Sequence, residues 1–207
     1  MNSETPSLAL EAKFELLIDG MLNQGFGLCD QFFSPDLLLG LQKNLMKYHQ
    51  SGEMHPAGVG RKFDYQRNAE IRGDVIRWIE PESADPHEAA FNQQIKAFVQ
   101  YLNQTCYAGI NAFEFHYASY EPGSFFKRHI DQFRSDRGRK YSLVMYLNEN
   151  WEAKDGGQLT LYLPDREETV VPIAGRAVFF KSDELEHEVK PAHERPRIGI
   201  AGWLKSV

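Results

Sequence analysis

The second half of the chain is divided into short β-rich runs that are separated by turn signals. Asp155-Gly156-Gly157 and Ala174-Gly175 are two of these turns. Many short strands at such spacing are typical of a sandwich or a jelly roll, in which two sheets pack face to face. The predicted strands cover residues 112–120, 142–147, 158–163, 169–171, 177–180 and 198–204.

The first part of the chain is predicted to be mainly helical. Apolar residues recur at helical spacing from residue 7 until Gly25. Ser34-Pro35 has the pattern of an N-cap followed by a proline at N1, so a second helix is expected to begin there. A third helix is predicted over residues 86–104. We therefore expect a mainly β fold with flanking α-helices, built on a double-stranded β-helix (a cupin-like jelly roll).

Length and charge restrict the domain organisation and the partners. The chain has 207 residues and a formal net charge of −6, so one domain over residues 1–207 is expected. Helical support and a loop would occupy mainly residues 1–110, and the jelly-roll core mainly 111–205. An acidic balance disfavours nucleic acid as a partner, and no apolar run reaches the roughly 18 residues of a membrane span. We expect a cytoplasmic monomer that has no nucleic-acid or membrane partner.

The segment 51–68 interrupts the helical pattern. It is polar, contains three glycines and shows no apolar period. Long loops in compact domains are often functional. We therefore predict a mobile loop that closes over a binding site.

Three residues are candidate metal ligands. His129 and Asp131 are separated by one residue, so on a strand both side chains would point to the same face. Together with His187 they would supply two imidazole nitrogens and one carboxylate oxygen, which is the ligand set of non-haem Fe(II) oxygenases. A surface histidine near an acid is the alternative, because one His-x-Asp pair can arise by chance.

Arg197 and Tyr146 are candidates for an anion site. On the last predicted strand, Arg197 shares a face with Gly199 and Ala201, which leave space in front of it. A buried guanidinium group requires an anion or an equivalent partner. Tyr146 could add a second donor, and the pair would suit a carboxylate. The alternative for Arg197 is a salt bridge at the end of a strand.

Several motifs occur in a common order along most of the chain. Together they resemble those of the 2-oxoglutarate- and Fe(II)-dependent prolyl hydroxylases, in particular the hypoxia-inducible-factor prolyl hydroxylases and their bacterial relatives. The resemblance covers about residues 25–204. The motifs are Ile71-Arg72-Gly73-Asp74, Trp78-Ile79-Glu80, Tyr120-Glu121-Pro122-Gly123, Arg128-His129-Ile130-Asp131, Tyr146-Leu147-Asn148, Gly156-Gly157-Gln158-Leu159, His187 through Ala192 and Arg197 through Trp203.

This resemblance implies a role for each matched position. Fe(II) would be bound by His129, Asp131 and His187, and the distal carboxylate of 2-oxoglutarate by Arg197 and Tyr146. Tyr120 would lie near the end of 2-oxoglutarate that chelates the metal. Segment 51–68 would be the finger loop. The residues implied in binding the protein substrate are Asp74, Arg139 and Trp203.

The implied reaction hydroxylates a prolyl residue with O2 and releases succinate and CO2, supported by ascorbate. Bacterial relatives imply elongation factor Tu as the protein substrate, and the resemblance to the hypoxia-inducible-factor branch implies oxygen sensing. Ala201 replaces a threonine of the family, and the finger loop differs in sequence. The alternatives are the same chemistry on another protein or a small molecule, or a metal-binding jelly roll that senses without turnover.

Overall fold

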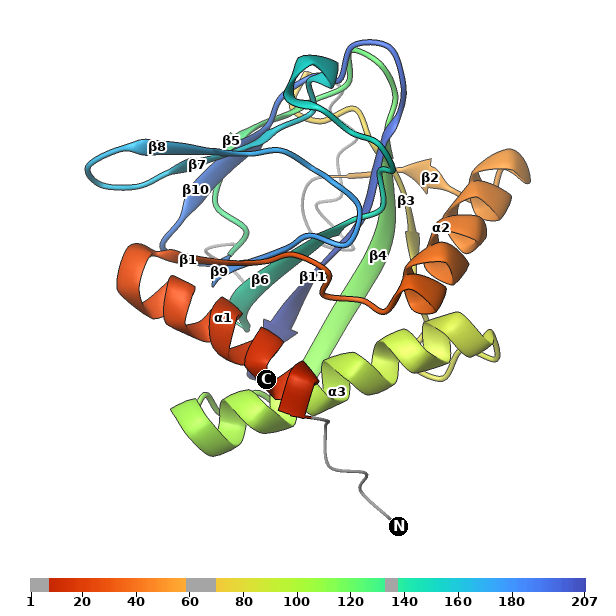
Figure 1. Ribbon diagram of the computed structural model, residues 1–207. Helices are drawn as coiled ribbons and strands as arrows, with labels where there is room; N and C mark the ends of the chain where they lie inside the picture. The colour runs from red at the N-terminus through yellow and green to blue at the C-terminus, as the bar shows by residue number, and fades with distance from the viewer. Residues whose placement is uncertain (1–7, 59–69, 133–137) are drawn as a thin grey trace.

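Three α-helices are present in a computed structural model that describes residues 8–58, 70–132 and 138–207 (Figure 1). The predictions of all three are confirmed, and the third continues two residues beyond its predicted end. The Ser34 hydroxyl accepts a hydrogen bond from Leu37 N at 3.3 Å, with Pro35 directly after the cap. The helices are α1 (Leu8–Gln24), α2 (Pro35–Gln50) and α3 (Pro86–Cys106).

The larger of two antiparallel sheets contains the longest strands. Its seven strands run in the order β1-β9-β6-β11-β4-β3-β2. The central strand β11 pairs with β4 on one side and with β6 on the other. The strands are β1 (Phe26–Cys29), β2 (His55–Pro56), β3 (Val75–Trp78), β4 (Ala112–Tyr120), β6 (Arg139–Tyr146), β9 (Ala177–Lys181) and β11 (Arg197–Lys205).

The smaller sheet has four strands in the order β5-β10-β7-β8. A 3₁₀ turn, η1 (Ala153–Asp155), lies in the connection between β6 and β7. The predicted mainly β fold with flanking helices is confirmed. The strands of this sheet are β5 (Phe126–His129), β7 (Leu159–Tyr162), β8 (Glu167–Val170) and β10 (Glu186–Val189).

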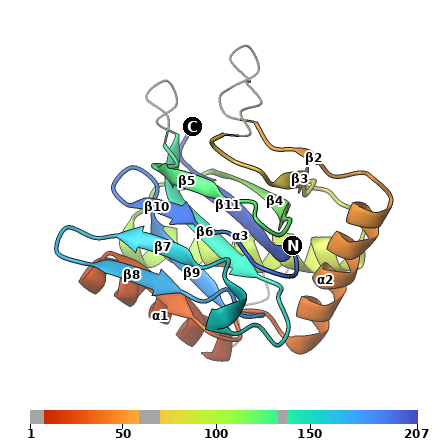
Figure 2. The same cartoon turned by 90° about the horizontal axis from the view of Figure 1, so that it is seen from above.

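The larger sheet lies between the helices and the smaller sheet, as Figures 1 and 2 show. Alternation along β6 divides its side chains between two cores. Leu143 and Met145 belong to the core on the helix side, together with Phe14 and Phe98. Tyr146 belongs to the core between the sheets, as the alternation predicts.

Five strands lie outside the predicted strand ranges: β1, β2, β3, β5 and β10. The predicted loop 51–68 is wrong in one respect, because His55 and Pro56 pair with β3. Residues 59–68 of that loop lie outside the described residues. Among the described residues, no helix is both long enough and apolar enough to cross a membrane.

Candidate active site

The two candidate histidines are paired across the smaller sheet. His129 ends β5, and its Cα partner on the antiparallel strand β10 is His187. Asp131 follows two residues beyond the end of β5. The prediction that His129 and Asp131 lie on one strand is therefore wrong. The turn after β5, rather than strand alternation, directs the Asp131 carboxylate toward both imidazole rings.

The hydrogen bonds of the two histidine rings leave one nitrogen of each directed at Asp131. Nδ1 of His129 lies 2.7 Å from the Lys127 carbonyl oxygen, and Nδ1 of His187 lies 3.1 Å from that of Leu185. A carbonyl oxygen only accepts, so each Nδ1 carries the proton and each Nε2 keeps its lone pair. The two Nε2 atoms lie 3.3 Å and 3.6 Å from the Asp131 carboxylate oxygens.

The Asp131 carboxylate is held by a chain of hydroxyl groups. Ser142 donates to its Oδ2 at 2.7 Å, and the Ser142 and Ser182 hydroxyls lie 2.8 Å apart. Burial acts to raise the pKa of Asp131, but His187, His129 and Ser142 outweigh burial and hold that pKa well below its ordinary range. Burial lowers the pKa of His187. An ionised carboxylate and a neutral imidazole are the forms that bind a metal.

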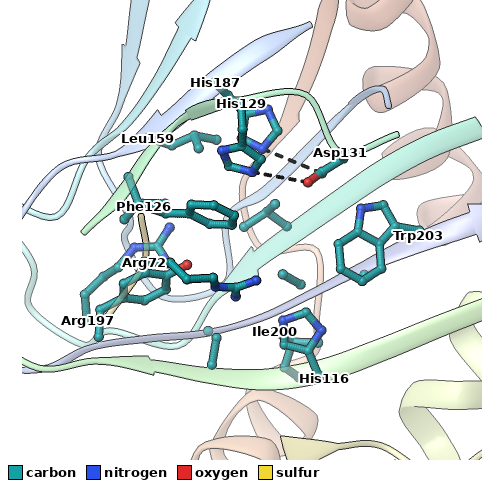
Figure 3. A pocket seen from close by; sticks show the side chains of 17 residues that line it. Arg72, His116, Phe126, His129, Asp131, Leu159, His187, Arg197, Ile200 and Trp203 are labelled. Carbon is teal, nitrogen blue, oxygen red and sulfur yellow. Dashed lines mark ion pairs between the residues drawn. The ribbon is translucent and has the colours of Figure 1, made fainter. Parts of the chain in front are cut away.

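The donor set fits a divalent transition metal. One ligand atom from each of His129, Asp131 and His187 lies within 4.8 Å of the others. Two imidazole nitrogens and one carboxylate oxygen are the 2-His-1-carboxylate set, which leaves metal positions open for other ligands. Figure 3 shows the three side chains together on one wall of a cavity.

A buried cationic group lies on another side of this cavity. Arg197 is 3% exposed, and its Nε donates to the Gly157 carbonyl oxygen at 3.1 Å. Its guanidinium carbon lies 5.0 Å from the ring centres of both Tyr120 and Tyr146. The Tyr146 hydroxyl is buried and has no hydrogen-bond partner in the described part of the chain. A bound carboxylate would accept hydrogen bonds from both the Arg197 guanidinium and the Tyr146 hydroxyl. The residues present therefore fit an anionic cosubstrate.

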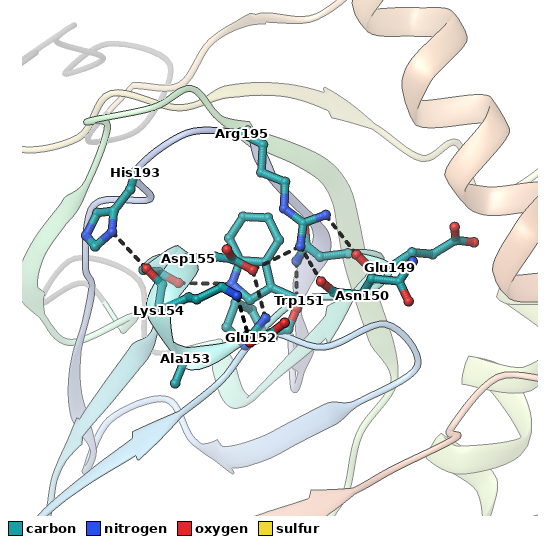
Figure 4. Close-up of polar contacts among 12 residues, drawn as sticks. Glu149, Asn150, Trp151, Glu152, Ala153, Lys154, Asp155, His193 and Arg195 are labelled. Atoms are coloured by element: carbon teal, nitrogen blue, oxygen red, sulfur yellow. Dashed lines mark hydrogen bonds and ion pairs between the residues drawn. The ribbon is translucent and has the colours of Figure 1, made fainter.

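The backbone that receives Arg197 is fixed by a polar cluster between two loops (Figure 4). Trp151 Nε1 donates to Gly156 O at 3.0 Å, and Arg195 lies over the Trp151 ring at 4.4 Å. Arg195 also donates to Asp155 at 3.0 Å. This cluster joins the β6–β7 and β10–β11 connections and places the Gly157 carbonyl in front of Arg197.

A groove of about 510 Å³ adjoins the inner cavity. Trp203 and Arg139 both line it, and the Arg139 guanidinium carbon lies 3.4 Å from the Trp203 ring centre. Arg139 also donates to Glu114 at 2.9 Å. The residues that line both the groove and the inner cavity are Arg72, His116, Phe126, His129, Asp131 and Trp203.

Asp74 is 2% exposed and lies behind Arg72. It accepts two hydrogen bonds from Arg72, at 2.7 Å and 2.5 Å. Arg72 lines both cavities and lies 4.3 Å over the Phe126 ring. The structure thus brings Arg72, rather than Asp74 itself, to the surface of the groove.

Sequence reasoning missed four residues of this site: Arg72, His116, Phe126 and Ser142. Alternation with Tyr146 along β6 places Ser142 on the inner face, so the sequence contained a signal for it. Phe126 stacks on His129 with ring centres 3.6 Å apart, and the sequence carries no signal for that contact.

Comparison with known proteins places this arrangement in a family. Residues 115–205 match the model of the 2OG-Fe(II) oxygenase superfamily. Human Egl nine homolog 1 is 26% identical over 210 residues, which cover 96% of this chain and 48% of that protein. Rat Egl nine homolog 1 is also 26% identical, over 62% of its length. The chain therefore spans about half to three fifths of the length of these curated relatives.

Two solved structures are similar over nearly their whole length. A Pseudomonas putida prolyl-4-hydroxylase is 36% identical with a TM-score of 0.84, over 94% of this chain and 99% of that one. A prolyl hydroxylase from Trichoplax adhaerens, solved with a hypoxia-inducible-factor peptide, is 26% identical with a TM-score of 0.86, over 96% and 91%. The chain belongs to the 2OG-Fe(II) oxygenase superfamily, whose name states the iron and the cosubstrate that its members use.

Proposed function

We propose that this protein is an Fe(II)- and 2-oxoglutarate-dependent dioxygenase that hydroxylates a prolyl residue of a protein substrate. The reaction consumes O2 and releases succinate and CO2. The observation that carries the proposal is the cluster of His129, Asp131 and His187, within 4.8 Å, at the junction of an inner cavity and an outer groove.

In this proposal the three clustered residues bind the iron. Iron and 2-oxoglutarate, when bound, supply the oxidising chemistry that no protein side chain can supply. The chain supplies the orientation: the Lys127 and Leu185 carbonyls hold the two imidazole rings, and Ser142 holds the Asp131 carboxylate. Such supporting hydrogen bonds set the orientation and basicity of metal ligands.

Arg197 and Tyr146 bind the distal carboxylate of 2-oxoglutarate in this assignment. The Arg197 guanidinium and the Tyr146 hydroxyl can both donate hydrogen bonds. Both side chains are buried away from water, so their attraction for an anion is strong. Tyr120 lies opposite Arg197 in the β4–β11 register and is assigned to the part of 2-oxoglutarate that faces the metal. Phe126 also lines this cavity.

The groove receives the protein substrate. We assign Trp203 and Arg139 to contact with the segment that contains the target proline. Asp74 contributes to substrate binding indirectly, because it accepts hydrogen bonds from Arg72, which lines the groove. Prolyl hydroxylation is supported by the Pseudomonas relative at 36% identity. We propose elongation factor Tu as the substrate, and all 207 residues as one catalytic domain.

Four finer properties belong to the same proposal: a cytoplasmic location, a monomeric state, stimulation by ascorbate, and a role in oxygen sensing. Light scattering of the purified protein tests the monomeric state. The dependence of turnover on dissolved O2 tests sensing, because a sensor must be limited by O2 over the physiological range.

The experiment for the main proposal combines two readouts. Purified elongation factor Tu is incubated with the protein, Fe(II), 2-oxoglutarate and air, and its peptides are mapped by mass spectrometry. Succinate is measured in the same samples, with His129→Ala as the control. One added oxygen atom on a proline, absent with His129→Ala, supports enzyme class and substrate together.

The other outcomes separate the parts of the proposal. Succinate without modification of elongation factor Tu would retain the oxygenase and point to a different protein or a small molecule. The absence of both signals from protein that binds iron would contradict the proposed activity.

A further inference from the structure

Two side chains that line the groove each contain a buried polar atom that lacks a hydrogen-bond partner among the described residues. These atoms are Nδ1 of His116 and Nε1 of Trp203. His116 is 3% exposed and Trp203 is 8% exposed, and both side chains line the groove and the inner cavity. Leaving a buried polar group unpaired is costly. These atoms therefore indicate a ligand that the chain does not itself supply.

Neighbouring rings keep His116 in place. Its ring centre lies 5.0 Å from that of Trp78 and 5.5 Å from that of Trp203, and the two tryptophans lie 6.4 Å apart. Arg139 lies over the Trp203 ring. The His116 ring therefore packs against both tryptophans, which restricts its rotation.

The strand register places this pair at the groove end of the site. His116 is opposite Ala201 on β11, whereas Tyr120 is opposite Arg197. Four residues along a strand correspond to about 13 Å. Figure 3 shows Arg197 and Trp203 at opposite sides of the cavity. His116 and Trp203 thus lie on the groove side of the cavity, away from the carboxylate site proposed at Arg197.

The chemistry of the two groups favours a neutral acceptor. The indole Nε1 of Trp203 can only donate. Burial, followed by the positive charge of Arg72, lowers the pKa of His116 to about 3. The imidazole is therefore neutral at ordinary pH, with one donor and one acceptor nitrogen. A neutral donor suits a peptide carbonyl oxygen, which every residue of a polypeptide offers.

We propose that His116 and Trp203 hydrogen-bond to a backbone carbonyl group of the peptide segment that lies in the groove, which makes His116 a specificity-determining residue. The inference rests on the proposed function, because it assumes a peptide substrate. It adds a binding role for His116, which the sequence analysis did not identify as a site residue.

The test compares His116→Met with His116→Asn. Methionine fills the space without a donor, whereas the asparagine amide can replace the imidazole Nδ1. The probe is a pool of blocked synthetic pentapeptides with a central proline and varied neighbours, from which mass spectrometry selects the peptide that the unaltered protein oxidises best. KM for that peptide, KM for 2-oxoglutarate and kcat are then measured, together with thermal unfolding.

His116→Met should raise the peptide KM about tenfold, the effect of roughly one lost hydrogen bond in a buried site. KM for 2-oxoglutarate should remain unchanged in His116→Met. His116→Asn should restore much of the peptide affinity. Trp203→Phe removes the indole Nε1 donor together with part of the ring system, and it should also raise the peptide KM. His193→Met is the matched control, because this exposed histidine contacts Lys154 far from the groove.

Each outcome decides the inference. Unchanged peptide KM in His116→Met, with an active unaltered protein, would overturn it and leave the proposed function intact. Equal losses in both His116 variants, together with a raised KM for 2-oxoglutarate or a lower melting temperature, would show a purely structural role and also overturn it. If the unaltered protein oxidises no prolyl peptide or protein, the proposed function fails and this inference fails with it.

Discussion

The Ser142 hydroxyl donates a hydrogen bond of 2.7 Å to Asp131 Oδ2, the carboxylate that both His129 and His187 face. Ser142 lies on β6 and Asp131 follows β5, so this bond joins the two sheets at the candidate metal-binding cluster. It orients the carboxylate and helps to keep it ionised.

We therefore expect Ser142→Ala to weaken metal binding about 10- to 100-fold, the usual effect of removing a hydrogen bond behind a metal ligand. Titration calorimetry with Mn(II), a redox-stable substitute for Fe(II), measures the affinity. Ser206→Ala is the control, because the backbone N–H of Ser206 donates to Gly138 O and the substitution leaves that donor in place. Equal affinities of Ser142→Ala and the unaltered protein would contradict the role of this bond.

Gly157 is a position where an added methyl group would reach Arg197, the residue proposed to bind 2-oxoglutarate. Its φ is +69°, and a Cβ atom there would lie 3.2 Å from Arg197 Cγ and 3.3 Å from Trp151 Cζ2. Gly157→Ala should lose about 1–2 kcal/mol of unfolding free energy from the left-handed backbone alone. It should also raise KM for 2-oxoglutarate, because Arg197 must move.

Gly109→Ala separates the two effects in urea unfolding and in kinetics. Gly109 has a φ of +65°, but nothing lies within 4 Å of the added methyl group. It should lose similar stability and keep the KM for 2-oxoglutarate. A rise in KM in both variants would mean that backbone strain, and not contact with Arg197, disturbs the site.

The buried Tyr146 hydroxyl lacks a partner among the described residues, so its removal should not destabilise the protein in the absence of 2-oxoglutarate. Tyr146→Phe should instead weaken binding of 2-oxoglutarate about 10- to 100-fold, because a hydrogen bond to a charged group is worth about 1.5–3 kcal/mol. Isothermal titration of the Mn(II)-loaded protein measures this loss.

Tyr117→Phe is the matched control for that measurement. The Tyr117 hydroxyl is also buried without a partner among the described residues, but its ring packs on the helix side of the larger sheet. Its removal should leave 2-oxoglutarate affinity unchanged. Loss of affinity in Tyr117→Phe but not in Tyr146→Phe would reverse our assignment of the two faces.

His116 should make stability depend on pH in acid. Its pKa in the folded protein is about 3, below the ordinary value of 6.5, because burial favours the neutral ring. The unfolded chain therefore takes up the proton first, so stability is full above about pH 6.5 and falls as the pH decreases. His116→Met should remove up to about 1.4 kcal/mol per pH unit of this slope.

Urea unfolding between about pH 6 and pH 4 measures the difference between the two proteins. A chelator is present in both series, so that the metal ligands contribute alike. Parallel curves for His116→Met and the unaltered protein would show that His116 is protonated without cost in the folded state.

Local sequence patterns were sufficient for the elements whose hydrophobic period is strong. Apolar spacing and the Ser34-Pro35 cap located α1, α2 and α3, and alternation along β6 and β11 placed Tyr146 and Arg197 on the inner faces. The same alternation carried Ser142 to the inner face, although its partner could not be known from β6 alone.

The strands that carry the two histidines of the candidate metal-binding cluster could not be predicted from a hydrophobic period. The sequences of β5 and β10 are short and rich in charged residues, so neither has the pattern of a buried strand. Pairing between them, and of β10 with β7, makes them strands.

The sequence by itself determined which side chains were available: two histidines, one aspartate, and an arginine with small residues beside it. Only the tertiary structure decided that His129 lies opposite His187 and that His116 packs against both Trp78 and Trp203. The physical reason is that periodicity is a property of neighbouring residues, whereas register and the partners of buried polar atoms depend on hydrogen bonds between segments far apart in the chain.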